Sequence, residues 1–444
     1  MTEGSPALDA APTPVPVVLP GKAAPGGGRS RLRGLLDRVG PGVITGAADD
    51  DPSGIATYSQ VGAQFGYALG WTILFSTPFM VAVQEISAWI GRATGRGLGA
   101  ALADHAPRGV VATLVGLLVV ANVINLGADI GAMAGAAQLV LGGPVAVFTV
   151  LLAVLCATCE IWFSYKRCVA VLKWLALSLF AYVLLLVVVR VPLREVLWGA
   201  FVPHLQGSGV LTALVAVLGT TISPYLFFWQ AAEEAEDEQA GPDPRPLCEH
   251  PQDAPAQMAR IRADTVTGMV FSNLVALSIM AGSAATLHAG GVTEVNTAAD
   301  AAAALRPLAG SFASLVFAAG IIGTGLLAVP VLAGSAAYGV GEALRWTVGL
   351  DRRFREARAF YGVIAAATAL GAAITFAPIS PMRALYWSAV INGVVAAPLI
   401  AAMVVLGSRT SVMGGLVLPW RLRLMGWATA LLMAAATGGM LMLG

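Results

Sequence analysis

The stretch Asp49-Asp50-Asp51-Pro52-Ser53-Gly54 places three carboxylates, a proline and a glycine inside an otherwise apolar segment that runs from residue 41 to residue 67. A charged side chain at bilayer depth is costly. Irregular backbone is tolerated there only where it is buried in protein or lines a cavity. If the segment lies in a membrane, the interruption therefore predicts a site for an ion or a substrate.

The composition of the chain is that of a membrane protein. Of its 444 residues 57% are hydrophobic and only 11% are charged, with a mean hydropathy of +0.78. Soluble domains have roughly a quarter of their residues charged. We therefore expect an all-α polytopic membrane protein, and the net charge of +1 gives no reason to expect nucleic acid as a partner. Apolar windows predict about eleven transmembrane helices, near 41–66, 70–91, 111–141, 145–164, 168–190, 208–232, 264–288, 311–341, 359–377, 383–406 and 424–442.

The basic residues indicate the orientation of these helices. If the N-terminus is cytoplasmic, the outside loops contain only Arg190, Arg194, Arg306 and Arg383 of the 26 lysines and arginines. Cytoplasmic loops of membrane proteins are enriched in lysine and arginine. We therefore expect a multi-pass protein of the cell membrane with its N-terminus in the cytoplasm and its C-terminus outside.

Two segments are predicted to lie outside the membrane. Residues 1–36 begin with a stretch rich in Pro, Ala and Gly and contain no apolar h-region, which indicates a disordered cytoplasmic tail rather than a signal peptide. The closely spaced acidic residues of 233–238 indicate a solvated helix end, followed by an acidic and Pro-rich cytoplasmic loop over 236–260. The alternative is a vestibule that attracts cations.

Cysteine and histidine give no support to a bound metal cofactor. Cys156 and Cys159 form a C-x-x-C inside the fourth predicted span, without a second pair, so packing is the favoured interpretation. The four histidines fall in loops or at span ends and form no HExxH. We expect no resident cofactor, no enzymatic activity and no obligate protein partner.

A second interruption lies five spans downstream, at 219–225, where Gly219-Thr220-Thr221-Ile222-Ser223-Pro224-Tyr225 repeats the order of glycine, oxygen-bearing side chains and proline. Broken helices at corresponding positions of two halves are the best sequence pointer to an inverted-repeat transporter. An odd number of spans between them inverts the second half, as such a repeat requires. We place repeat one at about 37–200, repeat two at about 205–408 and an extra helix at about 420–444.

The two breaks offer hard oxygen ligands. The candidates are the Asp51 carboxylate, the hydroxyls of Ser53, Thr220, Thr221 and Ser223, the carbonyls of Ala48 and Thr220, and, more weakly, the Asp50 carboxylate, with Gly54 leaving space. Oxygen-only sites suit Mg²⁺, Ca²⁺ or Mn²⁺, whereas softer metals usually enlist thioether, thiolate or imidazole ligands. Mg²⁺ keeps several waters and needs a wide site. Asp51 is the expected primary ligand.

Three runs in the first span resemble the first transmembrane helix of the NRAMP divalent-metal transporters: Gly40-Pro41-Gly42, 51–57 (Asp-Pro-Ser-Gly-Ile-Ala-Thr) and 62–67 (Gly-Ala-Gln-Phe-Gly-Tyr). The resemblance implies eleven helices in a LeuT-like architecture of two inverted five-helix repeats, with helices 1 and 6 broken. The family's first-helix motif is Asp-Pro-Gly-Asn, and its sixth-helix motif contains Met-Pro-His.

The chain departs from that pattern at the metal-binding positions. Gly54 stands at the Asn position, Ser223 at the Met position and Tyr225 at the His position. These departures resemble the NRAMP-related magnesium transporters, whose site is wider and binds a partly hydrated ion. In the third span the Asp position is Asp129, while a neighbouring acidic position is Ala132. The resemblance therefore implies uncoupled, potential-driven entry of Mg²⁺ or Mn²⁺.

Further polar residues mark a possible ion path. Asn122, Asn125 and Asp129 share one face of the third span, as a hydrophilic lining or as helix–helix hydrogen bonds. We favour the lining, because Asp is the costlier residue to bury. Tyr225 and Asn392 complete the path residues.

Three alternatives are a proton-coupled Mn²⁺/Fe²⁺ importer, a sodium-coupled carrier of organic solutes and a membrane-embedded aspartyl hydrolase. The hydrolase lacks a GxGD or HExxH motif.

Overall fold

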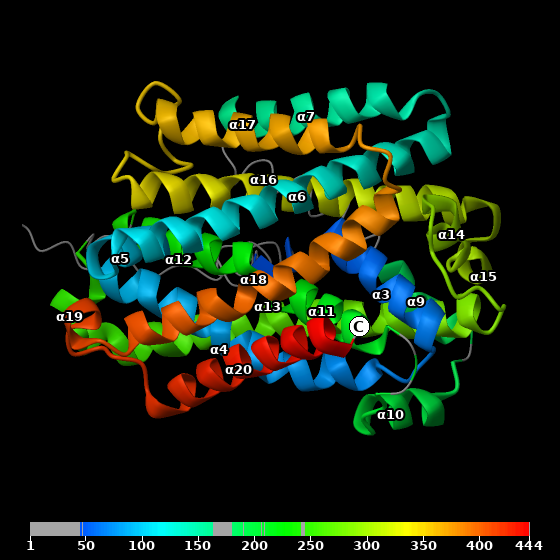
Figure 1. The fold of residues 1–444 in the computed structure, drawn as a ribbon, viewed down its shortest axis with the longest axis horizontal. Coiled ribbons are helices and arrows are strands. Elements are labelled where there is room, and N and C mark those ends of the chain that lie inside the picture. The colour runs from blue at the N-terminus through cyan, green and yellow to red at the C-terminus, as the bar shows by residue number, and fades with distance from the viewer. Residues whose placement is uncertain are drawn as a thin grey trace, which may run out of the picture. The chain divides into compact units, whose positions relative to one another are not determined.

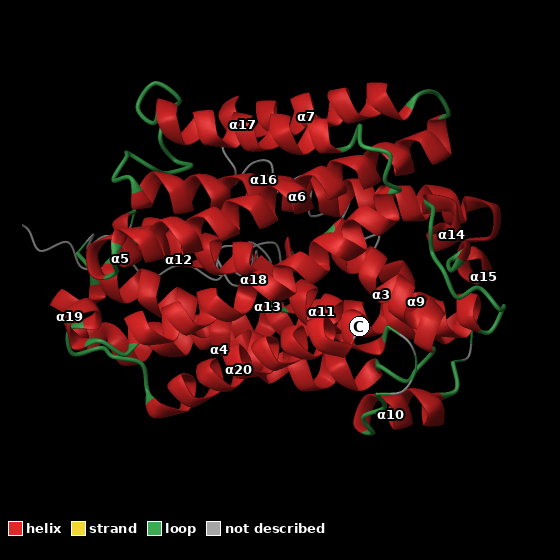
Figure 2. Ribbon diagram, in the orientation of Figure 1, coloured by secondary structure: helices red, strands yellow, loops and turns green. Residues whose placement is uncertain are grey.

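The computed structural model describes residues 45, 46, 48–162, 180–189, 191–205, 207, 209–240 and 245–443, and the regular elements within these ranges are helices (Figure 2). The contacts divide the chain into residues 1–39 and one compact unit over 40–444. The expected tail over 1–36 lies outside the described residues, as does the start of the first predicted span.

Eleven apolar helical segments of the described chain lie at the positions of the expected spans, although residues 168–179 and 190 of the fifth span lie outside the described residues. Seven are long enough to cross a membrane: α4 (Gly70–Thr94), α6 (Arg108–Leu141), α11 (Val210–Thr221) together with α12 (Pro224–Gln239), α13 (Ala254–Ser283), α16 (Ala313–Ala343), α18 (Pro381–Gly407) and α20 (Trp420–Leu443). Four are shorter: α3 (Pro52–Phe65), α7 (Val145–Trp162), α9 (Phe180–Val188) and α17 (Arg358–Ile374). The first and sixth are the broken ones, since α3 begins at Pro52 and α12 at Pro224.

The segment between α12 and α13 is shorter than the expected loop over 236–260. Helix α12 continues to Gln239, and α13 begins at Ala254, after two short 3₁₀ turns at Leu247–Glu249 and Pro251–Asp253. The first turns of α13 carry polar side chains that pair with α12 and α4. Because these first turns are polar, a search for apolar windows begins the predicted span only at residue 264.

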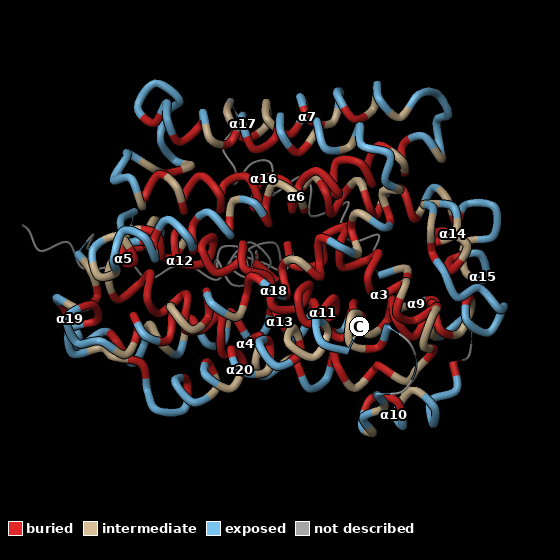
Figure 3. The backbone as a smooth tube through the Cα atoms, viewed as in Figure 1, coloured by how far each residue is buried: buried red, intermediate tan, exposed pale blue. Residues whose placement is uncertain are grey.

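The helices form layers that run along the long axis of the compact unit (Figure 1). Helices α7 and α17 form one outer layer, α6 and α16 pack beneath them, and α3, α12, α13 and α18 lie at mid-depth, with α4 and α20 on the far side. Burial is greatest in the middle layers, whereas α7 and α17 expose much of their outer surface (Figure 3). The two broken helices therefore lie in the buried interior.

Glycines let the two halves of the sixth helix approach different neighbours. A Cβ added at Gly91 of α4 would lie 2.2 Å from the carbonyl oxygen of Ala231 in α12, and one at Gly219 of α11 would lie 2.0 Å from that of Ala389 in α18. Small residues permit this backbone-to-backbone packing between membrane helices. Thus α12 packs closely on α4, and α11 packs closely on α18.

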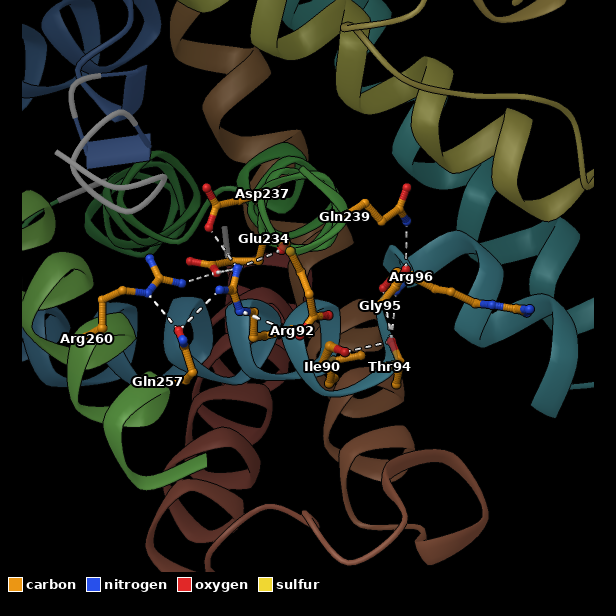
Figure 4. Close-up of polar contacts among 11 residues, drawn as sticks. Ile90, Arg92, Thr94, Gly95, Arg96, Glu234, Asp237, Gln239, Gln257 and Arg260 are labelled. Carbon is orange, nitrogen blue, oxygen red and sulfur yellow. Dashed lines mark hydrogen bonds and ion pairs between the residues drawn. The ribbon is translucent and has the colours of Figure 1, made fainter. Parts of the chain in front are cut away.

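A buried ionic cluster joins α4, α12 and α13 at one end of the unit (Figure 4). Arg92 of α4 donates to Asp237 at 2.7 Å and lies 3.6 Å from Glu234 and 3.7 Å from Glu238. Arg260 of α13 lies 2.5 Å from Glu234. The side chains of Arg92, Glu234 and Glu238 are 11%, 0% and 4% exposed. The expectation of a solvated helix end is therefore wrong for Glu234 and Glu238, because their carboxylates are neutralised inside the protein.

Removing the central cation of this cluster is expected to destabilise the protein. Because truncating one member of a buried ion pair leaves the other charge uncompensated, Arg92→Ala should lower the free energy of unfolding by about 3–5 kcal/mol. Thermal unfolding of the detergent-purified protein measures the change. The matched control is Arg96→Ala, which removes the 60%-exposed partner of Asp104 and should cost at most about 1 kcal/mol. Equal effects of the two variants would contradict the structural role of the cluster.

Candidate functional site

The first break is organised around Asp51. Residues 48 and 49 are helical, Asp50 lies in a bend, and Asp51 is extended and caps the N-terminus of α3. Its Oδ1 accepts hydrogen bonds from the backbone N–H of Gly54 and the hydroxyl of Ser53, each at 2.7 Å. Pro52 suits the first helical turn because its missing N–H is not needed there. The local sequence thus fixes the position of one carboxylate.

The second break lies at Ile222 and Ser223, between α11 and α12. Ser223 is extended and precedes Pro224, and its hydroxyl donates to the carbonyls of Gly219 and Thr220 at 3.1 and 2.9 Å. Tyr225 reaches across to the first break, where its hydroxyl donates to the Ala48 carbonyl at 3.1 Å. A Cβ added at Gly54 would lie 3.2 Å from Oγ1 of Thr220. The structure therefore brings the two breaks together, as their paired occurrence in the sequence predicts.

Helix α6 supplies an amide and a second carboxylate. Asn125 donates from Nδ2 to Oδ2 of Asp51 at 3.0 Å and to Oδ2 of Asp129 at 3.3 Å. Its Oδ1 accepts from Asn392 of α18 at 3.4 Å. These four side chains are at most 2% exposed. They form a buried polar chain from α3 through α6 to α18.

The other two aspartates face a different helix. The hydroxyl of Ser272 in α13 lies 2.7 Å from Oδ2 of Asp49 and 3.2 Å from Oδ1 of Asp50. Asp51 instead faces α6. The carboxylates of Asp49 and Asp50 therefore share one partner on α13, while that of Asp51 is directed to α6.

Two predicted side chains point away from this meeting point. Oγ1 of Thr221 donates back along α11 to the carbonyls of Val217 and Leu218 at 3.0 and 3.3 Å. Nδ2 of Asn122 donates to the carbonyl of Leu332 in α16 at 3.0 Å. The Asn122 amide thus makes the helix–helix hydrogen bond that was the alternative interpretation, while Asn125 and Asp129 face Asp51.

The electrostatics of the breaks favour a cation. The C-terminal ends of α11 and of the helical residues before Asp50 meet here, and both ends present carbonyl oxygens with partial negative charge. The Asp51 carboxylate adds a full negative charge. A carboxylate has about four lone-pair positions, and three donors approach that of Asp51. Acceptor capacity therefore remains for an ion.

A cavity lies beside the far end of α3 and does not reach Asp51. This cavity of ≈ 420 Å³ is lined by Gln60 and Gln64 of α3, Thr212 of α11, and Arg383 and Trp387 of α18. Asp51 itself is 2% exposed. In this structure the site is therefore closed, and an ion reaches it only if the helices move.

Sequence reasoning did not include three residues beside the site. They are Ser272, which contacts two aspartates, Tyr58, whose buried hydroxyl has no hydrogen-bond partner among the described residues, and Met133 of α6, whose sulfur lies 2.2 Å from the position of a Cβ added at Gly325. Ser272 is a hydroxyl within an apolar span, a signal that the sequence contains. Tyr58 and Met133 are ordinary residues of a buried helix and give no such signal.

Comparisons with known proteins identify relatives of this chain. The family model described as Natural resistance-associated macrophage protein-like (Nramp) matches residues 42–443. The divalent metal cation transporter MntH of Deinococcus radiodurans is 28% identical over 435 residues, covering 95% of this chain and 92% of the relative.

Solved structures share the fold. A manganese transporter of Eremococcus coleocola, in complex with an aromatic bis-isothiourea substituted compound, superposes with a TM-score of 0.72 at 18% identity, over 93% of this chain and 87% of the other. MHP1, a nucleobase-cation-symport-1 family transporter, superposes with a TM-score of 0.50 at 14% identity, over 90% and 92%.

The all-helical, LeuT-like fold is confirmed by these structures. The prediction of a transporter rather than an enzyme is also confirmed, which excludes the aspartyl hydrolase. The family model extends over nearly the whole chain, through both breaks, and the chain belongs to the Nramp family.

Proposed function

We propose that this chain imports divalent cations, Mg²⁺ and Mn²⁺, by alternating access through a site centred on Asp51. The observation that carries the proposal is the buried Asp51 carboxylate, held at the meeting point of two broken helices by Ser53, Gly54 and Asn125. Divalent metal cation transport is the activity named for the Deinococcus relative. The Ala48 and Thr220 carbonyls and the Thr220 hydroxyl are the further ligands, with Asp50 in a weaker role.

The preference for a hard ion rests on the chemistry of the two breaks. Ser223 stands where the family motif has Met, and its hydroxyl caps backbone carbonyls. Gly54 brings the start of α3 close to the second break, since even an added Cβ would lie 3.2 Å from Oγ1 of Thr220 and 3.3 Å from the Tyr58 ring. A site lined by oxygens suits a hard ion such as Mg²⁺. A transition metal would lose the thioether that usually selects it.

Proton coupling is not part of the proposal. Asp129 is present, but Ala132 stands at the family's neighbouring acidic position.

We place the protein in the cell membrane with a cytoplasmic N-terminus and an outside C-terminus, on the distribution of lysine and arginine. The inverted repeats are proposed at about 37–200 and 205–408, with α20 as the additional helix.

Ion flux in proteoliposomes tests this function directly. Uptake of Mg²⁺, Mn²⁺, Ca²⁺ and Cd²⁺ is measured beside an internal pH dye, under an imposed membrane potential. We expect Mg²⁺ and Mn²⁺ to enter, uptake to increase with an inside-negative potential, and internal pH to stay constant. Acidification together with Mn²⁺ entry and no Mg²⁺ entry would instead support the proton-coupled importer.

Replacing the primary ligand should abolish uptake. Loss of a group that only supports a metal ligand costs about 10–100-fold in affinity, so Asp51→Ala, which removes the ligand itself, should reduce uptake by more than about 100-fold. The matched control is Thr221→Val, because the Thr221 hydroxyl is directed back along α11. Size-exclusion profiles establish that both variants fold. Normal uptake by a folded Asp51→Ala protein would falsify the assignment.

Restoring a thioether should make the site prefer softer metal ions. Ser223→Met places sulfur at the second break, and we expect the ranking of ions to shift toward Cd²⁺ and Mn²⁺ and away from Mg²⁺. Competition of each ion against Mn²⁺ uptake measures the ranking. Met133→Leu is the control, since this native thioether packs against Gly325 and should leave the ranking unaltered. An unchanged ranking in Ser223→Met would reject the argument from ligand hardness.

A further inference from the structure

Helix α10 (Leu193–Phe201) is too short to cross a membrane and lies beside the start of α4 (Figure 1). It has nine residues between α9 and α11, and a helix needs about 20 to span the hydrocarbon core. Its buried residues are Gly199 and Ala200. The remaining surface of α10 is covered by no helix of the described chain.

The uncovered surface of α10 is largely apolar, with the exposed Arg194 between Phe201 and Trp198 and the exposed Glu195 at its edge. Leu193, Leu197 and Phe201 recur at four-residue spacing and therefore share one side of the helix, with Trp198 next to them. These four side chains are 73%, 55%, 62% and 62% exposed. Such a cluster of large apolar side chains marks an interaction surface when it lies outside the core.

Lipid is the occupant that fits this face. Helix α4, which packs beside α10, exposes the apolar side chains of Leu74 and Phe75 just over one turn after Gly70, so the face of α10 adjoins an apolar surface of a span. Trp is enriched where membrane and water meet, and the long side chain of Arg194 reaches toward headgroups. A second copy of the chain fits less well. A nine-residue helix is about 14 Å long and 10 Å wide, far below the ~800 Å² per partner of a stable interface.

The opposite side of α10 contacts the turn that joins α3 to α4. A Cβ added at Gly199 would lie 2.0 Å from the carbonyl oxygen of Tyr67, and one at Gly70 would lie 3.5 Å from the Gly199 carbonyl. Backbone therefore packs on backbone at this point. The turn directly follows α3, whose N-terminus carries Asp51. A displacement of α10 would therefore press on the turn that follows α3.

We propose that α10 is an interfacial helix whose face of Leu193, Leu197, Trp198 and Phe201 inserts into the lipid at this end of the spans. Anchored in this way, α10 braces the turn between α3 and α4 and so helps to hold α3 in place. The binding partner is the acyl-chain and headgroup boundary of the bilayer, and the recognition is apolar burial with an aromatic at the interface.

Spin labels test the lipid contact without disturbing transport chemistry. In a cysteine-free background reconstituted in liposomes, Leu197→Cys is labelled and its accessibility to oxygen and to a water-soluble nickel complex is compared with two references. Val187→Cys, 75% exposed on α9, is the lipid reference, and Glu294→Cys, 69% exposed by its side chain, is the water reference. We expect residue 197 to follow Val187. Agreement with Glu294, or spin–spin broadening between copies, would overturn the lipid assignment.

A paired substitution tests the brace. Leu197→Ser with Trp198→Ser removes two apolar anchors, and we expect Mn²⁺ uptake per folded protein to fall at least about threefold as that burial is lost. The control is Leu370→Ser with Ile374→Ser, an equivalent exchange on the exposed surface of α17, which should leave uptake unchanged. Unaltered uptake in the α10 variant, or an equal loss in the control, would overturn the brace.

Discussion

The structure depends on a charged carboxylate that takes the place of helical hydrogen bonding at the first break. Asp51 accepts from Gly54 and Ser53 with one oxygen and from Asn125 with the other. A helix begins with unpaired N–H groups, and at this depth no water satisfies them. The carboxylate that caps α3 is thus needed for the break to exist, and the same group remains as an anion in the centre of the protein. One side chain therefore determines the local structure and, in the proposed function, also binds the ion.

The need to satisfy the buried Asp51 carboxylate explains why the residues around the first break are polar and tightly packed. Asn125 donates to both Asp51 and Asp129, and Asn392 donates to Asn125, so three helices are linked to the break. The Tyr225 hydroxyl satisfies the Ala48 carbonyl at the end of the preceding helical residues. Buried polar groups cost several times less when each has a partner. Oxygens of Asp129, Thr220 and Tyr58 are among the buried polar atoms that have no partner in the described residues, and a bound cation could be coordinated by those beside Asp51.

The sequence predicted the parts of the fold that local physics determines. Pro52 and Pro224 each occupy the first helical position after a polar break. The two breaks lie five spans apart at corresponding positions of the two halves, and their meeting was predicted from that spacing. The burial of Glu234 and Glu238 did not follow, because it depends on Arg92, which lies some 140 residues earlier in the chain. The sequence also did not predict the directions of the Thr221 and Asn122 side chains. Asn122 was predicted to line a path and Thr221 to bind the ion, but each side chain donates to a backbone carbonyl within reach.

The two halves of the sixth helix pack chiefly on different helices, and the break at Ser223 lies between the two halves. Helix α11 is held on α18 by the contact of Gly219 with Ala389, while α12 is held on α4 by the contact of Gly91 with Ala231 and by the Arg92 cluster. The contact of α11 with α18 places backbone against backbone, and the contact of α12 with α4 adds buried charges. Neither contact can therefore loosen gradually. Relative movement of the two halves is therefore concentrated in the two non-helical residues Ile222 and Ser223. Those residues lie beside Asp51, so an ion bound there contacts both halves and is sensitive to their separation.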